Sequence, residues 1–199
     1  MREVETGEVR PARCDANFCG WCGPVRARQV AGAIPLGKPE RLITLTQVGE
    51  DHDRRRARVK WLRYLVEREC GRIEWCWHCE PNPGETGHHV HAWQRGDFLD
   101  QKALSRLADR CGMGRVVDIR KWERPEGTPG IDYGLKLAGV SYGLKLAESV
   151  QMMGEYLGAN GGRLVHQSRG FFPGGLRAAM RAALGGVEGT WVLERGEVV

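Results

Sequence analysis

The sequence predicts an α+β fold, in which a central antiparallel sheet carries helices on one of its faces. Two observations support this prediction. Segments of strand length alternate with two amphipathic helical segments in the order β-α-β-β-α-β. The chain, at 199 residues, is also long enough for one domain that buries its own hydrophobic core.

The first half of this order consists of a strand, a helix and a hairpin of two strands. A strand is expected at 41–47, because RLITLTQ is rich in β-branched residues. A helix is expected over 53–70, where apolar side chains recur on one stripe and Gly71 follows as a stop signal. The segment 72–80, the turn-rich PNPGETG and the segment 88–94 then form a hairpin of two strands.

The second half adds a helix over 100–111, with Gly112 behind it, and a further strand at 114–122. The complete order is the split βαβ order of ferredoxin-like and RRM-like sheets, which places both helices on one face. A turn-rich linker then leads into a helical C-terminal part from about 131 to 157, and a short helix is expected around 176–184.

Composition divides the chain into three expected parts: a Cys-rich, zinc-binding segment over 1–40, the main domain over 41–172, and a basic C-terminal tail over 173–199. The net charge of +5 and local clusters of Arg and Lys fit a polyanionic partner, although the cluster at 54–63 fits a solvated helix face equally well. The sequence has no Walker-type phosphate loop, which excludes a helicase or ATPase of that kind.

The sequence also lacks an apolar run of the roughly 20 residues that a membrane span needs, and its charged N-terminus has no apolar signal core. Seven cysteines, an odd number without an export signal, favour reduced thiols or a metal site over a disulfide framework. We therefore expect a cytoplasmic protein without a membrane partner.

His89 and His91 are the strongest candidates for metal ligands. On a strand, alternate side chains share a face, so both histidines point one way while Val90 points into the core. Glu80 lies on the preceding strand, shares a face with His78, and can converge with the pair in an antiparallel layout. Two neutral imidazoles and a carboxylate suit Mg²⁺ or Mn²⁺ as a Lewis acid, although Zn²⁺ also accepts this set. The plain alternative is that the histidines are satisfied polar residues at a sheet edge.

Two copies of Tyr-Gly-Leu-Lys-Leu-Ala supply the candidate nucleophile, with Tyr133 and Lys136 in the first copy and Tyr142 and Lys145 in the second. Within each copy, Tyr and Lys are three residues apart and share a helix face. A phenol is a poor nucleophile at neutral pH, and a nearby ammonium and a metal-polarised phosphate both favour its attack, which gives a covalent phosphotyrosine. On one unbroken helix the two tyrosines face opposite ways. We favour Tyr133, because the linker from the preceding strand delivers it directly, and keep Tyr142 as its rival.

A cluster of Cys14, Cys19 and Cys22 supplies three thiolates in a short, loop-rich stretch. This spacing is typical of a structural Zn²⁺ site that takes its fourth ligand from elsewhere, and free thiols are the alternative. A second Cys-x-x-Cys runs from Cys76 to Cys79 on an expected strand. Residues three apart on a strand lie on opposite faces and cannot chelate one ion, so we expect these two cysteines to pack in the interior.

Together, these motifs resemble those of the HUH endonucleases, and specifically of the rolling-circle replication initiator (Rep) proteins of small plasmids and phages. The likeness rests on LITLTQ as the first-strand motif, on Glu80 before GHHVHAW, and on the Tyr-x-x-Lys of Tyr133 and Lys136. The cysteine cluster and RLVHQSRGFF at 163–172 look like those of the zinc-type members. The resemblance covers the chain from about residue 13 to residue 172.

The resemblance implies an enzyme that nicks single-stranded origin DNA by metal-assisted tyrosine attack, leaving a 5′-phosphotyrosine and a free 3′-OH, and that can rejoin the ends. It implies a divalent metal held by His89, His91 and Glu80. The implied partners are origin DNA, a host helicase and a polymerase, in the cytoplasm of the host cell. Related proteins often carry a Tyr directly after the Tyr-x-x-Lys motif, whereas Leu137 stands here, which favours one nucleophile per chain.

DNA contacts are expected from Arg163, His166 and Arg169, which would bind phosphates, with Phe171 and Phe172 stacking on bases. Core packing is the alternative for the two phenylalanines. The nearest alternative function is a relaxase or a single-strand transposase of the same fold. The alternative from a different class is a non-catalytic, zinc-stabilised DNA-binding protein that regulates replication or transcription.

Overall fold

We describe the protein from a computed structural model. The residues that the structure describes are grouped in the following ranges: 2–3, 26, 29–30, 32–48, 52–81, 87–122, 163–183 and 191–192.

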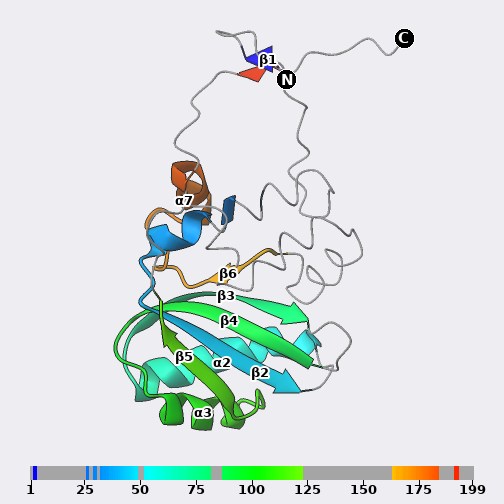
Figure 1. The fold of residues 1–199 in the computed structure, drawn as a ribbon, viewed down its shortest axis with the longest axis vertical. Helices are drawn as coiled ribbons and strands as arrows, with labels where there is room; N and C mark the ends of the chain where they lie inside the picture. Colours follow the sequence, from blue (N-terminus) through cyan, green and yellow to red (C-terminus); the bar gives the residue numbers. More distant parts are fainter. Residues whose placement is uncertain are drawn as a thin grey trace, which may run out of the picture.

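A five-stranded antiparallel sheet forms the centre of the described structure, with the strand order β5-β2-β4-β3-β6 (Figure 1). The strands are β2 (Arg41–Val48), β3 (Ile73–Pro81), β4 (Gly87–Gly96), β5 (Val116–Lys121) and β6 (His166–Gln167). Each neighbouring pair in this order runs antiparallel. A separate two-stranded pair joins β1 (Arg2–Glu3) to β7 (Trp191–Val192).

The helices α2 (His52–Glu69) and α3 (Gln101–Arg110) lie together on one face of this sheet. Their buried side chains pack with every second residue of the central strands, including Leu62 of α2, Leu104 of α3 and Val90 of β4. The helix α3 begins after Asp100, whose carboxylate accepts a hydrogen bond from the backbone N–H of Ala103 at 2.8 Å. This core is where the apolar stripe of the 53–70 sequence predicted that it would be.

The opposite face of the sheet carries a second hydrophobic cluster. It joins the sheet residues Cys76 and Trp93 to side chains from both ends of the chain. These are Val30, Ala33, Ile34, Leu164, Val165, Phe171, Phe172, Ala179 and Met180. The short 3-10 helix η1 (Ile34–Gly37) and the helix α7 (Leu176–Ala183) lie beside each other here (Figure 1).

Phe171 and Phe172 are part of this core, so the expectation that they stack on DNA bases is wrong. They are 0% and 1% exposed, and their rings meet edge to face with centroids 4.8 Å apart. Phe171 packs directly against Gly37, where even a Cβ atom would lie 2.2 Å from its ring. Arg95 fixes this contact, because its guanidinium donates to the carbonyl oxygens of Gly37, at 2.8 Å, and Gly170.

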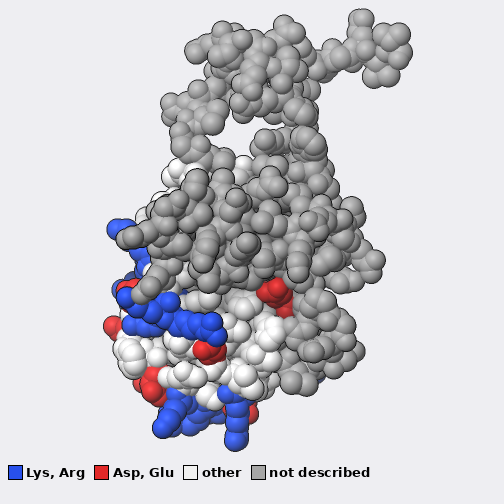
Figure 2. All heavy atoms as spheres, viewed as in Figure 1, with Lys and Arg blue, Asp and Glu red and all other residues white. Residues whose placement is uncertain are grey.

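The coarse prediction of an α+β fold with an antiparallel sheet is confirmed. The strand and helix bounds agree with the expected ranges to within a few residues wherever the structure describes them. Figure 2 shows Lys and Arg at the lower end of the molecule, over α3, and in a second group higher up on the left, with Asp and Glu among them.

Candidate functional site

The two histidines of the His-Val-His motif lie on the face of the sheet opposite α2 and α3. Their ring centroids are 6.1 Å apart, and Val90 between them is fully buried against the helices. Glu80 of β3 is the register partner of His89, and its Oε2 lies 3.1 Å from Nε2 of His91. The structure therefore brings His89, His91 and Glu80 together on one face, through the hairpin of β3 and β4.

Two threonines of β2 hold the histidine rings from the other side. Thr44 and Thr46 are the register partners of His91 and His89. The hydroxyl of Thr44 lies 3.2 Å from Nδ1 of His91, and the hydroxyl of Thr46 lies 3.0 Å from Nδ1 of His89. When each Nδ1–H donates to its threonine oxygen, the ring orientation is fixed and Nε2 carries the lone pair that a cation would take. The two threonines lie outside the hairpin that carries the histidines and Glu80, so the spacing of the motif did not reveal them.

The imidazole and carboxylate groups are suitable ligands for a hard divalent cation, and the distance between two of them also fits one. The 3.1 Å between His91 and Glu80 is close to the separation of adjacent ligands in an octahedron with bonds of about 2.1 Å. Both side chains are about one-sixth exposed, at 15% and 16%, so they are accessible to an ion and partly shielded from bulk water. Among the described residues, however, no group of three or more His, Cys, Asp and Glu side chains is arranged so that it could hold an ion as it stands. His89, His91 and Glu80, which we call the histidine row, therefore supply ligands but not a closed coordination shell.

His78 belongs to the same row, although sequence reasoning left it out of the site. It is the register partner of His91, and its ring centroid lies 5.5 Å from that of His91 and 5.4 Å from that of Trp93. It is 1% exposed. Burial, and secondarily the nearby His91, holds the pKa of His78 well below the usual value for imidazole, so this ring is neutral at physiological pH. The sequence indicates the position of His78, because it lies two residues before Glu80 on the same strand and therefore on the same face.

Several expected site residues lie outside the described residues: Tyr133, Lys136, Tyr142, Lys145, Cys14, Cys19 and Cys22. Their placement relative to the histidine row stays a prediction. The described cysteines Cys70, Cys76 and Cys111 are free thiols. Cys76 and Cys79 are both fully buried, in the clusters on opposite faces of the sheet, as their spacing on a strand predicted. Burial raises the pKa of the Cys76 thiol, which makes it an inert packing residue.

The expected DNA-binding residues at 163–169 lie at the β6 edge of the sheet. His166 is 9% exposed and stacks on Trp77, with ring centroids 4.3 Å apart and planes 20° apart. Trp77 faces α2 and α3, so this pair is on the other side of the sheet from His91. Arg163 and Arg169 are exposed. The structure therefore does not bring His166 together with the histidine row.

Comparison of the chain with protein-family models, with curated proteins and with solved structures found no match. Among the described helices, none combines the length and the apolar character that crossing a membrane requires.

Proposed function

We propose that this chain is a metal-dependent endonuclease of the HUH type, a rolling-circle replication initiator that nicks single-stranded origin DNA. One observation carries the proposal: His89, His91 and Glu80 are neighbours on one sheet face, with a threonine hydroxyl at the Nδ1 of each histidine. A site built only for packing does not need two partly exposed imidazoles and a carboxylate in a row, because such groups are more stable in water.

The fold is part of the proposal. The elements β2, α2, β3, β4, α3 and β5 follow one another along the chain, and the four strands lie in the order β5-β2-β4-β3. We assign this arrangement to the split βαβ class of ferredoxin-like sheets. We also retain the zinc-binding segment, in which Cys14, Cys19 and Cys22 supply three thiolates.

The proposed chemistry begins with the ligands. His89, His91 and Glu80 would hold Mg²⁺ or Mn²⁺, which when bound supplies Lewis-acid polarisation of a phosphodiester. A cation bound at Nε2 would leave the Nδ1–H of each imidazole to donate to Thr44 or Thr46, which orients the two rings. The neutral state of His78 avoids a further positive charge beside the cation.

The tyrosine supplies the nucleophile in this scheme. The phenolic oxygen of Tyr133, or of its rival Tyr142, forms a new bond to phosphorus, and the bond from phosphorus to the 3′-oxygen breaks. The phenol proton leaves, the 3′-oxygen takes up a proton to become the 3′-OH, and the 5′-phosphate stays on the enzyme as an ester. Lys136 or Lys145 favours the phenolate through its ammonium charge. Attack of the 3′-OH on the same ester reverses the reaction and rejoins the strand.

The test is covalent capture of DNA by the full chain. The protein is incubated with a random-sequence library of single-stranded DNA and Mn²⁺, and adducts that survive denaturation are counted and sequenced. We expect adducts from the wild type, their loss in His91→Ala and Glu80→Gln, and their loss in either Tyr133→Phe or Tyr142→Phe. Tyr64→Phe is the matched control, because Tyr64 is exposed on α2 and away from the row.

Two results would overturn the proposal. DNA retained without any adduct favours the non-catalytic DNA-binding protein. Adducts that persist when both Tyr133 and Tyr142 are replaced remove the tyrosine mechanism. A relaxase or a single-strand transposase of the same fold gives the same adducts, and the sequences captured would distinguish these activities from replication initiation.

A further inference from the structure

A cavity of about 400 Å³ lies at the β6 edge of the sheet, between α2 and the second hydrophobic cluster. Its lining comes from α2, from the edge formed by β3 and β6, and from α7. Trp75, Trp77 and the stacked His166 are part of its wall. The cavity is separate from the row, because none of His78, Glu80, His89 and His91 lines it.

The charged side chains that line this cavity, within the part of the chain that the structure describes, are all cationic. They are Arg26, Arg56, Lys60, Arg63 and Arg163. Three of them are spaced by four and three residues along α2, so they share one face of that helix. Like charges at this spacing destabilise a helix unless an anion offsets them. The arrangement therefore favours a negatively charged occupant.

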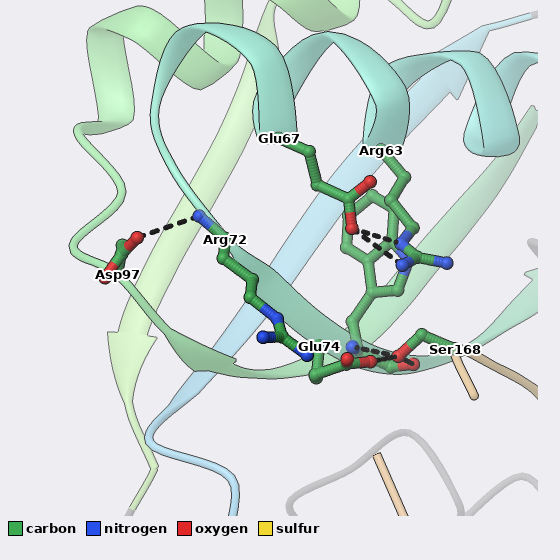
Figure 3. A network of polar contacts seen from close by, with 7 residues as sticks. Arg63, Glu67, Arg72, Glu74, Asp97 and Ser168 are labelled. Carbon is green, nitrogen blue, oxygen red and sulfur yellow. Dashed lines mark hydrogen bonds and ion pairs between the residues drawn. The ribbon is translucent and has the colours of Figure 1, made fainter. Parts of the chain in front are cut away.

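One of these cations is paired with a described carboxylate. Arg63 pairs with Glu67 through two contacts of 3.0 and 2.6 Å, and Figure 3 shows Arg63 pointing from α2 toward the strand that carries Glu74. The carboxylate of Glu74 does not line the cavity; it accepts a hydrogen bond from the hydroxyl of Ser168 (Figure 3). The Nε of Arg56 is shielded from solvent and has no hydrogen-bond partner among the described residues. A buried donor without a partner is destabilising, so binding of an oxygen atom there is favourable.

Part of the remaining wall is apolar, with Val30, Leu176 and Met180 facing the same space, and Gln167 and Ser168 add polar groups. A cavity that pairs arginines with an apolar wall suits a ligand that has a phosphate at one end and a flat or apolar group at the other. Its volume is within the range of small-molecule sites. We propose that this cavity binds a nucleotide, with the phosphate held by the cations of α2 and by Arg163 and with the sugar or base against the apolar wall.

This inference does not depend on the nuclease proposal. The nucleotide is either free or one unit of a DNA strand, since both present the same phosphate chemistry. The test measures binding of a fluorescent mononucleotide to the full chain by anisotropy, with a single-stranded oligonucleotide and inorganic phosphate as competitors. The variants are Lys60→Glu and Arg163→Glu, because both residues are exposed and their replacement leaves the core intact. The control is Lys102→Glu, which makes the same change of charge on the exposed side of α3.

We expect the mononucleotide to bind to the wild type. Its affinity should fall at least tenfold in Lys60→Glu and in Arg163→Glu, and should change less than twofold in Lys102→Glu. Binding of the oligonucleotide alone, with the same pattern of variants, identifies the DNA strand as the source of the nucleotide. Absence of binding by both probes overturns the inference, and so does an equal loss in Lys60→Glu and Lys102→Glu, which indicates general charge attraction. His91→Ala should leave this binding unchanged, so failure of the nuclease proposal and failure of this one give different results.

Discussion

His78 should make the stability of the protein depend on pH. The ring is 1% exposed, and burial holds its pKa well below the unfolded value of about 6.5. As pH falls below about 6.5, the unfolded chain takes up a proton at this position that the folded protein does not take up. The free energy of unfolding therefore falls with decreasing pH, by up to about 1.4 kcal/mol per pH unit from this one group, until pH approaches the folded pKa. Above the unfolded pKa, the ring is neutral in both states and contributes no slope.

The substitution His78→Asn isolates this contribution, because it removes the titrating group and keeps a polar atom near the position of Nδ1. Urea unfolding of both proteins, with a chelator present, gives the free energy of unfolding at a series of pH values from about 7.5 down to about 5. We expect the wild-type slope to exceed the variant slope below about pH 6.5, by up to about 1.4 kcal/mol per unit, and the two slopes to agree above it. Parallel curves over the whole range would refute the reasoning, whatever the constant offset between them.

Further predictions concern packing and the orientation of the ligands. Gly37→Ala should lower the free energy of unfolding by about 1–3 kcal/mol in urea titrations, because the new Cβ would lie 2.2 Å from the ring of Phe171. Gly32→Ala is the control and should cost much less, since its Cβ meets its nearest neighbour at 3.5 Å; equal costs would contradict this reading. Thr44→Val should weaken Mn²⁺ binding by about 10–100-fold, because it removes the hydroxyl at Nδ1 of His91. An unchanged affinity would show that this contact does not orient the ring.

The sheet and its two covering helices were predictable because their patterns are local. The alternation in GHHVHAW places Val90 on one face and the histidines on the other, and the structure has the same parity. The apolar stripe of the 53–70 helix likewise specifies which side of α2 is buried, as the full burial of Leu62 shows. Gly71 has a positive φ of 115°, which fits its predicted role after the helix.

The second core was not predictable from periodicity, because its contacts join segments far apart in the sequence. The strand β6 has only two residues, and η1 has four, so neither produces a periodic signal. The packing of Phe171 on Gly37 depends on a chain reversal that no local pattern specifies. For this reason, the aromatic pair at 171–172 could be read either as a surface for bases or as core.

The candidate site was predictable in part for the same reason. Glu80 and His91 meet because they belong to one hairpin, and the hairpin is visible in the sequence. Thr44 comes from β2, whose pairing with β4 is a long-range contact, so its role at His91 appears only in the structure. The alternation of residues on the strand predicts the face on which His78 lies. It does not predict that His78 is buried beside Trp93.

The most direct test of the metal site is a Mn²⁺ titration of the full chain followed by electron paramagnetic resonance. The wild type should bind one Mn²⁺. The affinity for this ion should fall at least tenfold in His91→Ala and in Glu80→Gln. Glu67→Gln should bind as the wild type does, because Glu67 pairs with Arg63 on α2 and is not part of the row. Mn²⁺ binding that is absent from the wild type, or that is the same in all four proteins, would contradict the proposal that these histidines and this carboxylate hold a cation.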